Sequence, residues 1–302
     1  MSSRIAQNTR GTLSFLLMIV YTAVIMVPLF LFAFAKLLSP TRGVRDVFRR
    51  ALARLVETWI GLNTLLFALN RSTRWAIDVP DGLDREGCYL VASNHQSWVD
   101  ILALQKAFNR RLPILRFFIK QELIWVPFLG AAWWALDFPF MRRPSREEIA
   151  RNPKLKGKDL ENARRACEKF RERPVAMMTF AEGTRFSAAK SAATNSPYDN
   201  LLKPKIGGIG IVLYALGNRL QSLIDVTIVY PDGPAKFWSM CCGAHVEAQV
   251  HVRQRAVEDW LTAGDYENDR DWRRRVQDWL GDIWQEKDEL IQQTLDRRKP
   301  HD

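Results

Sequence analysis

The sequence predicts an α/β fold in which helices flank a mixed β-sheet, preceded by a transmembrane helix and an interfacial helix. Short apolar runs at residues 88–92 and 175–180 have strand length and composition. Stretches of helical periodicity separate them, and a strand, helix, strand order is typical of a parallel-sheet unit. A long stretch without charge near the start of the chain adds the membrane element.

Residues 11–35 carry no charge and are bracketed by Arg10 and Lys36. As a helix they would span about 37 Å at 1.5 Å per residue, enough for a hydrocarbon core of about 30 Å. A signal peptide is the alternative, because residues 33–35 resemble a cleavage site, but its apolar region usually has only about 7 to 15 residues. We therefore expect a transmembrane anchor at residues 1–38.

Basic side chains are concentrated after this stretch. Two precede it and six lie between Lys36 and Arg54, so the positive-inside rule predicts that Met1 faces outward and the rest of the chain lies in the cytoplasm. The next apolar run, residues 58–70, is too short to span a bilayer. It is typical of a helix lying in the membrane interface or of an ordinary core helix. Of these two, we expect the interfacial helix, within a basic segment at residues 39–72.

The composition favours an anionic partner. The chain has 44 Lys and Arg against 33 Asp and Glu, a net charge of +11, which suits nucleic acid, an anionic membrane surface, or an acidic carrier and substrate. The four cysteines lack the spacing of a disulfide framework or zinc site. Neither a Gly-x-Ser-x-Gly elbow nor a Gly-x4-Gly-Lys-[Ser/Thr] loop is present, which weakens serine-hydrolase and nucleotide-hydrolase alternatives.

A folded domain is expected at residues 73–260. Residues 117–140 are rich in aromatic side chains and predict a buried core, a wall for an apolar ligand, or a surface dipping into lipid. Residues 187–196 are rich in Ser, Ala, Thr and Asn and predict a mobile surface loop. Within residues 261–302 an amphipathic helix is expected, packed on the domain or touching the membrane.

Residues 94–100 read Asn-His-Gln-Ser-Trp-Val-Asp and follow the first strand-like run. A histidine oriented by a carboxylate can take a proton from a hydroxyl. Five residues on a helix place side chains roughly 140° apart, so His95 and Asp100 can meet only if His95 lies in the turn and Asp100 in the first helical turn. The alternative is a turn histidine and a solvated acid favoured by the helix dipole.

A second polar cluster, Phe180-Ala-Glu-Gly-Thr-Arg185, ends the other strand-like run. Ligands of open α/β sheets bind at the carboxyl ends of strands. The two clusters together therefore predict a site at one edge of the sheet.

These motifs resemble the lysophospholipid acyltransferase family, the 1-acylglycerol-3-phosphate acyltransferases and their relatives. The family's first block is Asn-His-x4-Asp and its third is Glu-Gly-Thr-Arg; residues 120–130 and 138–143 resemble its second. The likeness is strongest from Cys88 to Pro231. The fourth block departs from the family, since no proline precedes its strand at residues 225–231.

The resemblance implies a glycerolipid acyltransferase-like fold and transfer of a fatty acyl group from acyl-CoA or acyl carrier protein to the free hydroxyl of a lysophospholipid. The favoured acceptor is 1-acylglycerol-3-phosphate, giving phosphatidic acid at the bacterial inner (cytoplasmic) membrane, without nucleic acid. Another lyso-lipid acceptor and a catalytically silent lipid-binding protein are the alternatives.

The same resemblance gives the roles of the residues. His95 is expected to be the general base and Asp100 its orienter, with no acyl-enzyme, metal or bound cofactor. Arg185 is the first candidate to hold the substrate phosphate. Glu182 would orient Arg185 or bind an acceptor hydroxyl. The remaining residues expected at the substrate are Asn94, Lys120, Arg142, Gly183 and Thr184.

Overall fold

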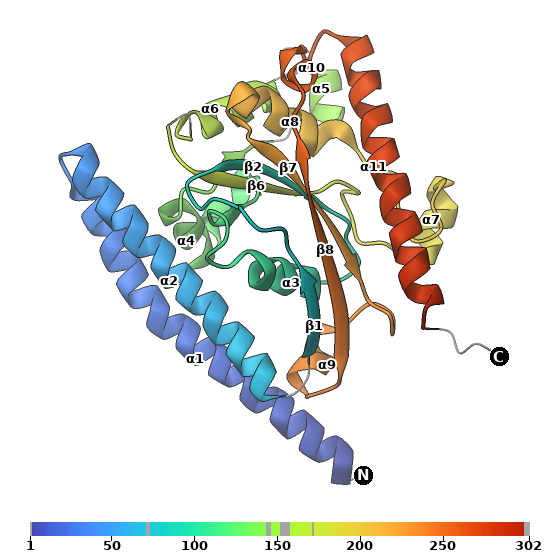
Figure 1. The fold of residues 1–302 in the computed structure, drawn as a ribbon. Helices are drawn as coiled ribbons and strands as arrows, with labels where there is room; N and C mark the ends of the chain where they lie inside the picture. Colours follow the sequence, from blue (N-terminus) through green and yellow to red (C-terminus); the bar gives the residue numbers. More distant parts are fainter. Residues whose placement is uncertain (1, 71–72, 143–145, 152–157, 171, 299–302) are drawn as a thin grey trace.

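The computed structural model describes residues 2–70, 73–142, 146–151, 158–170 and 172–298. Its centre is a six-stranded sheet in the order β1-β8-β7-β2-β6-β3 (Figure 1). Strands β7 and β8 run antiparallel, whereas the other neighbours are parallel, so the mixed sheet expected from the sequence is present. The strands are β1 (Thr73–Asp78), β2 (Cys88–Ser93), β3 (Leu115–Arg116), β6 (Val175–Phe180), β7 (Ser222–Val229) and β8 (Val246–Ala256). A separate parallel pair joins β4 (Ile119–Lys120) and β5 (Phe140–Met141).

The burial of each strand follows its place in the sheet. Every residue of β2 and β7 is buried, as expected for central strands covered on both faces. In β8 the alternating residues Val246, Ala248 and Val250 are buried and their neighbours are half-buried, which is the period of two that a one-sided strand requires. Central β2 therefore ends inside the protein, at the start of the Asn94–Asp100 turn.

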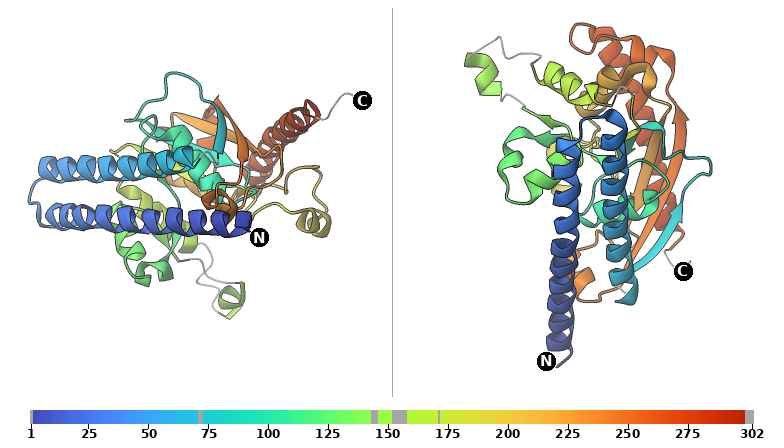
Figure 2. Two further views of the ribbon diagram at one scale, coloured as in Figure 1. Left: turned by 90° about the horizontal axis from the view of Figure 1, so that it is seen from below. Right: turned by 90° about the vertical axis from the view of Figure 1, so that its left-hand side faces the viewer.

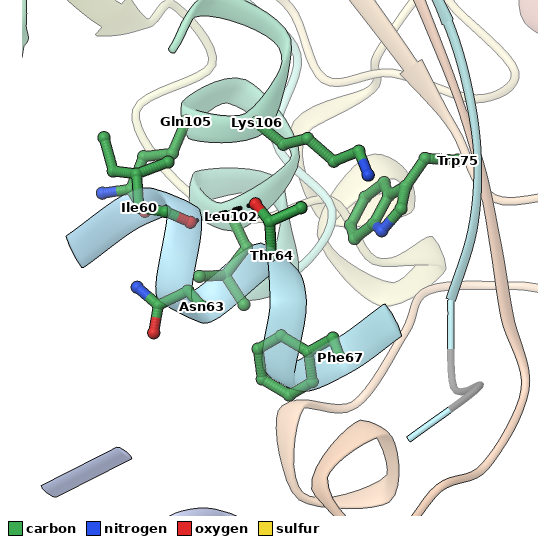
Figure 3. A pocket seen from close by; sticks show the side chains of 8 residues that line it. All are labelled: Ile60, Asn63, Thr64, Phe67, Trp75, Leu102, Gln105 and Lys106. Atoms are coloured by element: carbon green, nitrogen blue, oxygen red, sulfur yellow. Dashed lines mark hydrogen bonds between the residues drawn. The ribbon is translucent and has the colours of Figure 1, made fainter. Parts of the chain in front are cut away.

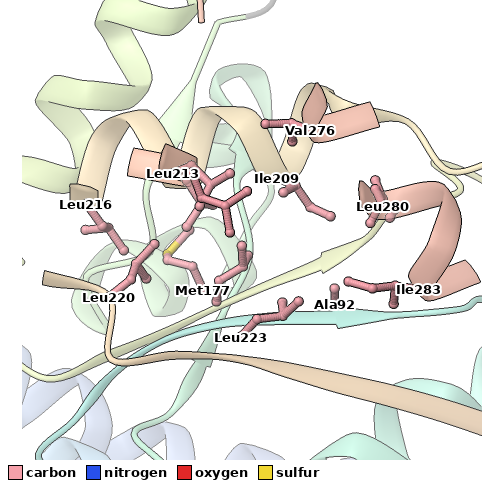
Figure 4. Close-up of a cluster of buried hydrophobic side chains, with 14 of the residues drawn as sticks. Ala92, Met177, Ile209, Leu213, Leu216, Leu220, Leu223, Val276, Leu280 and Ile283 are labelled. Atoms are coloured by element: carbon pink, nitrogen blue, oxygen red, sulfur yellow. The ribbon is translucent and has the colours of Figure 1, made fainter. Parts of the chain in front are cut away.

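Helices cover both faces of the sheet. On one face α3 (Val99–Phe108) packs against alternate residues of β2, such as Tyr89 and Val91. On the other face Leu90 and Ala92 join one cluster with side chains of α6 (Lys158–Glu168), α8 (Ile206–Leu216) and α11 (Arg270–Asp296). Figure 4 shows Ala92 in this cluster, facing side chains of α8 and α11. The shorter helices are η1 (Gln121–Trp125), α4 (Leu129–Ala135), α5 (Arg146–Arg151), α7 (Ala188–Thr194), η3 (Gly217–Arg219), α9 (Phe237–Cys241) and α10 (Asp259–Ala263).

The C-terminal helix α11 is part of the domain core. Its side chains at helical spacing, including Val276, Leu280 and Trp284, are buried and join the same cluster as Leu223 of β7. Of the two alternatives left by the sequence, packing on the domain is the one found. Residues 261–296 therefore stabilise the sheet directly.

The first two helices, α1 (Ser2–Leu38) and α2 (Arg42–Leu69), form an antiparallel hairpin (Figure 2). Tyr21 donates to Asn63 Oδ1 at 2.5 Å, and the Trp59 indole donates to Thr22 Oγ1 at 2.9 Å. By length and composition both helices could cross a membrane. The run expected at residues 58–70 is the last part of α2, which extends back through the basic segment.

Both ends of α1 contact the domain expected at residues 73–260. Near its start, a Cβ on Gly11 would lie 2.5 Å from Cys242 Sγ beside α9. Near its end, Lys36 Nζ donates to the Ala135 carbonyl at 2.6 Å. A helix that crosses a bilayer cannot keep both ends beside a domain on one side of it. This packing favours a helix α1 that lies along the domain, and the expected crossing, with Met1 outside, stays a prediction.

The segment expected to be a mobile loop contains helix α7. Ser187 caps its start, its Oγ accepting the backbone N–H of Lys190 at 3.3 Å, and Asn195 ends it in the left-handed conformation. Ser and Asn favour helix caps as strongly as they favour loops. Composition alone therefore could not distinguish a short capped helix from a loop.

Candidate active site

His95 lies in the turn after β2, and Asp100 lies in the first turn of α3. His95 Nδ1 is 2.8 Å from Asp100 Oδ2, which also accepts the backbone N–H groups of Gln96 and Ser97 at 2.7 and 2.9 Å. The two side chains thus meet in the only way that their spacing allows. Asp100 is fully buried, and these hydrogen bonds hold its carboxylate.

A tyrosine that the sequence reasoning did not assign completes this arrangement. Tyr230, just after β7, donates its hydroxyl to Asp100 Oδ1 at 2.7 Å. Burial and then the charge of Asp100 raise the pKa of Tyr230 well above 10.0, so the hydroxyl stays a donor. The signal available was its place in the fourth sequence block, at the end of a buried strand.

Asp100 fixes the tautomer of His95. Because the carboxylate accepts two backbone N–H groups and a tyrosine hydroxyl, it acts as an acceptor toward the imidazole also, and Nδ1 carries the proton. Nε2 is then free to accept a proton. The ring of Phe180 stacks on the imidazole with centroids 3.8 Å apart and planes 13° apart, which holds the plane of His95.

Glu182 holds the backbone of the His95 turn. Its Oε1 accepts the N–H of His95 and its Oε2 accepts the N–H of Leu202, both at 3.0 Å. The side chain is 1% exposed, and burial raises its pKa to about 7, against the lowering effect of these two hydrogen bonds. The expected contact of Glu182 with an acceptor hydroxyl or with Arg185 is therefore replaced by a contact with the backbone.

A buried lysine acts on this carboxylate through its charge. Lys287 of α11 is 1% exposed, forms an ion pair with Asp225 of β7 and donates to the Val226 carbonyl at 2.6 Å. Its positive charge lowers the pKa of Glu182, while burial lowers the pKa of Lys287 itself. Sequence reasoning missed it, although a lysine on the apolar stripe of an amphipathic helix was a signal.

Asn94 has a structural place instead of the expected place at the substrate. It is fully buried. Its amide nitrogen donates to the Ile228 carbonyl at 2.9 Å, and its amide oxygen accepts the Ile228 N–H at 2.8 Å. With both groups of the amide engaged, Asn94 joins the end of β2 to β7 and thereby positions the next residue, His95.

The Gly183-Thr-Arg185 segment presents positive charge beside the histidine. Gly183 has φ +73°, which allows the sharp turn after β6. The Phe186 N–H donates to the His95 carbonyl at 2.7 Å, so this turn lies next to the histidine. Arg185 is exposed, and its guanidinium lies over the Trp98 ring at 5.0 Å.

Two lysines add to this charge. Lys190 Nζ donates to Thr184 Oγ1 at 2.7 Å and to the Arg185 carbonyl at 3.0 Å. Lys205 lies beside Gly183, since a Cβ there would be 3.4 Å from Lys205 Nζ. Such a surface suits an anion.

Lys120 and Arg142 lie on the separate β4–β5 pair. Lys120 is exposed at the end of β4, opposite Met141 of β5, and Arg142 forms an ion pair with Glu148 at 3.0 Å. Among the described residues no hydrogen bond or ion pair joins either side chain to His95 or Arg185. Their expected contact with a phosphate stays a prediction.

An apolar cavity of about 440 Å³ begins beside the histidine. Phe180 forms part of its wall and also stacks on the His95 ring. The volume lies within the usual range of ligand pockets, about 300–1,000 Å³. Other lining residues come from the helical hairpin, α3, the segment after β3, and α4 with its C-cap, among them Leu29, Ile60, Ile101, Phe117, Ala132, Trp133 and Leu136. The aromatic-rich segment 117–140 therefore supplies a cavity wall.

A smaller recess of about 10 Å³ lies between α2, α3 and β1 (Figure 3). Asn63 and Gln105 face it together with Trp75. It has room for about one water molecule, so the larger cavity is the candidate substrate site. Within the ranges that the structure describes, no cluster of three His, Cys, Asp or Glu side chains could hold a metal ion.

Comparison with known families agrees with this geometry. The model of the family described as Acyltransferase matches residues 76–230, a range that contains His95, Asp100, Glu182, Arg185 and Tyr230. The chain belongs to the acyltransferase family. The matched range runs from β1 through β7, so the family assignment covers the strand ends that build the site.

Several acyltransferases are similar in sequence. The 2-acyl-1-lysophosphatidylinositol acyltransferase of Saccharomyces cerevisiae is 27% identical over 244 residues, covering 66% of this chain and 59% of the relative. The 1-acyl-sn-glycerol-3-phosphate acyltransferase 2 of Arabidopsis thaliana is 22% identical over 272 residues, covering 84% and 62%. The mouse 1-acyl-sn-glycerol-3-phosphate acyltransferase gamma is 25% identical over 214 residues, covering 67% and 52%. The chain thus spans a little over half of each relative's length.

One solved acyltransferase has a similar fold. The crystal structure of the 1-acyl-sn-glycerophosphate acyltransferase PlsC from Thermotoga maritima aligns with a TM-score of 0.54 and 16% identity, covering 98% of both chains. The likeness extends over the whole chain, helical hairpin included. A mixed sheet flanked by helices, preceded by apolar helices, is therefore the shared architecture.

Proposed function

We propose that this acyltransferase moves a fatty acyl group from a thioester donor to the free hydroxyl of a lysophospholipid. One observation carries the proposal: the hydrogen-bonded pair of buried Asp100 and half-buried His95 lies beside Phe180, which lines an apolar cavity of about 440 Å³. A base for a hydroxyl and a compartment for an acyl chain are the two parts that this reaction needs. The names of the plant and mouse relatives favour 1-acylglycerol-3-phosphate as the acceptor, giving phosphatidic acid.

The geometry suggests a direct transfer. Nε2 of His95 takes the proton of the acceptor hydroxyl while its oxygen attacks the carbonyl carbon of the thioester. Asp100 stabilises the imidazolium, and the hydrogen bond from Tyr230 keeps Asp100 in place. The carbon–sulfur bond then breaks, and the departing sulfur receives the proton from His95. The products are an ester and a free thiol, with no acyl-enzyme.

The phosphate of the acceptor would bind at Arg185. A guanidinium presents a planar fork of donors that matches phosphate oxygens, and Trp98 supports it from below. Lys190 and Lys205 contribute further positive charge around Gly183 and Thr184. Arg142 and Lys120, on the β4–β5 pair, are second candidates.

The donor is acyl-CoA or acyl carrier protein, used as a co-substrate without any bound cofactor. Both donors are anionic, in keeping with the net charge of +11. We place the enzyme at the cytoplasmic face of a bacterial inner membrane. There the exposed apolar side chains of α1, such as Val24 and Leu31, would enter lipid, and nearby basic residues would meet anionic headgroups.

A different lysophospholipid is the second candidate acceptor. The yeast relative is named for a lysophosphatidylinositol, and an exposed arginine binds the phosphate of either headgroup. A catalytically silent lipid-binding protein is less well supported, because such a protein would not need His95 and Asp100 in hydrogen-bond contact.

An acceptor screen tests the proposal. Purified enzyme in detergent would receive a panel of lysophospholipids with acyl-CoA or acyl carrier protein, and mass spectrometry would identify the products. We expect phosphatidic acid to form fastest. Faster acylation of another lysophospholipid would favour the second candidate, and no product with either donor would contradict the enzymatic proposal.

A further inference from the structure

Two large aromatic side chains are strongly exposed where η1 leads into α4. We call residues 123–129, from within η1 to the first residue of α4, the aromatic tip. Trp125 is 85% exposed and Phe128 is 69% exposed. Large aromatic side chains so strongly exposed, and close together in the chain, are typical of a contact surface.

The tip holds its aromatic side chains outward by its own backbone. Phe128 has φ +63° and ψ −49°, and the Leu129 N–H donates to the Pro127 carbonyl at 2.7 Å, which closes a tight and strained turn. A Cβ on Gly130 would lie 2.0 Å from the Ile124 carbonyl oxygen, so the two sides of the tip are in close contact. Strain of this kind is kept where surrounding structure enforces it, commonly at functional sites.

The tip lies beside the apolar helical hairpin. Lys36 of α1 donates to the carbonyl of Ala135 in α4, and Ala132 packs in one cluster with Leu29 and Ala33 of α1. Both views of Figure 2 show α4 next to α1, on the side away from α2. The exposed apolar surface of α1 therefore continues onto α4 and the tip.

The same helix forms a wall of the substrate cavity. Leu129, Trp133 and Leu136 of this region line the cavity, whereas Trp134 is 47% exposed. One side of α4 thus faces the candidate acyl compartment and another faces outward. A molecule that covers the outer side of α4 therefore lies within one helix diameter of the bound acyl chain.

We propose that the aromatic tip inserts into the lipid bilayer beside α1 and brings this wall of the acyl cavity to the depth of the lipid chains. The inference rests on the proposed membrane function and adds a second insertion element. Tryptophan favours the membrane–water interface, where its ring is apolar and its N–H stays wet. Residues 123–136 carry no charge, whereas an acidic carrier protein would need cationic partners.

Site-specific fluorescence tests the insertion. Trp125→Cys is labelled with an environment-sensitive maleimide in a Cys242→Ser chain, since the other three cysteines are buried. Vesicles contain phosphatidylethanolamine and phosphatidylglycerol, with or without brominated acyl chains. Val24→Cys on α1 and Ala193→Cys on α7 serve as controls. We expect the Trp125 and Val24 labels to shift to the blue and to be quenched by bromine, and the Ala193 label to show neither change.

The other outcomes are distinguishable. A Trp125 label that stays in water while the Val24 label enters lipid overturns the inference and leaves the membrane function intact. If both labels stay in water, the membrane function fails as well. A blue shift that acyl carrier protein produces without vesicles, or that rises with protein concentration alone, would assign the tip to a protein partner or to a second copy.

Activity gives an independent readout. Trp125→Ser with Phe128→Ser should raise the KM for an acceptor embedded in vesicles by at least about tenfold, because two apolar side chains leave the lipid. With a short-chain acceptor that is monomeric in water, KM and kcat should match those of the unaltered enzyme. An equal loss with both acceptors would contradict insertion.

Discussion

Glu182 accepts the backbone N–H of His95 at 3.0 Å. The carboxylate of the Glu-Gly-Thr-Arg motif therefore holds the histidine of the Asn-His-x4-Asp motif. The two residues follow β6 and β2, which are parallel neighbours. Their strands therefore deliver them to the same edge of the sheet. Because Glu182 also accepts the N–H of Leu202 with its second oxygen, its charge helps to hold the shape of the site.

This relationship predicts a pH dependence. The pKa of Glu182 is raised to about 7, so below this pH the carboxyl becomes protonated and one of its two backbone N–H partners loses its acceptor. We expect kcat to fall as the pH drops through about 7. Lys287→Met removes a charge that lowers the pKa of Glu182, and the acid limb should then move to higher pH.

Arg253→Met is the control for this shift, since Arg253 pairs with Glu286 at the surface. In the Lys287 variant Asp225 keeps Arg255 as a partner at 2.9 Å, and a thermal melt would show whether the variant folds. An unchanged acid limb in a folded Lys287→Met protein would show that Lys287 acts only in packing.

Arg185→Lys should raise the KM for a phosphate-bearing acceptor much more than the KM for the thioester donor, because lysine keeps the charge but loses the paired fork. Steady-state kinetics with each substrate varied in turn measure the effect. Arg142→Lys is the matched control and should change the acceptor KM less, since Arg142 pairs with Glu148. A donor-selective defect at Arg185 would place it at the thioester instead.

The cavity predicts control of acyl length. Ala132 lines it, whereas the adjacent Ala131 is exposed. Ala132→Met should shift the preferred donor to shorter chains, because the added side chain occupies part of the space, and Ala131→Met should leave the preference unchanged. Competition among acyl-CoA donors of different length, with products identified by mass spectrometry, measures both. The same shift in both variants would indicate a general disturbance of α4.

The packing of α1 predicts a topology. Because both ends of this helix contact the catalytic domain, we expect Gln7 and Ala193 to lie on the same side of the membrane. Single cysteines at these positions, treated with an impermeant maleimide on intact cells and after lysis, should both react only after lysis. Labelling of Gln7→Cys on intact cells, with Ala193→Cys protected, would place the two residues on opposite sides of the membrane and show that α1 spans it.

The local parts of the site could be predicted from the sequence. Apolar runs of strand length located β2 and β6, and the geometry of a helix showed that His95 and Asp100 could meet only across a turn. Both inferences depend on neighbouring residues, whose distances the chain itself limits. The segment at residues 117–140 was similarly limited to a few alternatives. Part of it lines the cavity, and its exposed tip is the part that we propose to enter lipid.

The parts that depend on distant contacts could not be predicted. Tyr230 contacts Asp100 and Lys287 contacts Asp225, in each case from an element far along the chain. The spacing of residues in the sequence does not limit the distance between such elements. Burial is equally invisible, so Asn94 and Glu182 were expected at the substrate although their polar groups are engaged by backbone. For α1, an apolar stretch predicts contact with lipid but not which side of the membrane its ends occupy.

The general base is the central element of this account, and the most direct measurement is the rate at which purified His95→Gln forms phosphatidic acid. Labelled 1-acylglycerol-3-phosphate would be supplied with acyl-CoA or acyl carrier protein. General base catalysis typically contributes about 10² to 10⁴-fold, so we predict a loss of at least about 100-fold, with an unchanged melting temperature and unchanged vesicle binding. A folded His95→Gln protein that kept more than about a tenth of the rate would contradict the assignment.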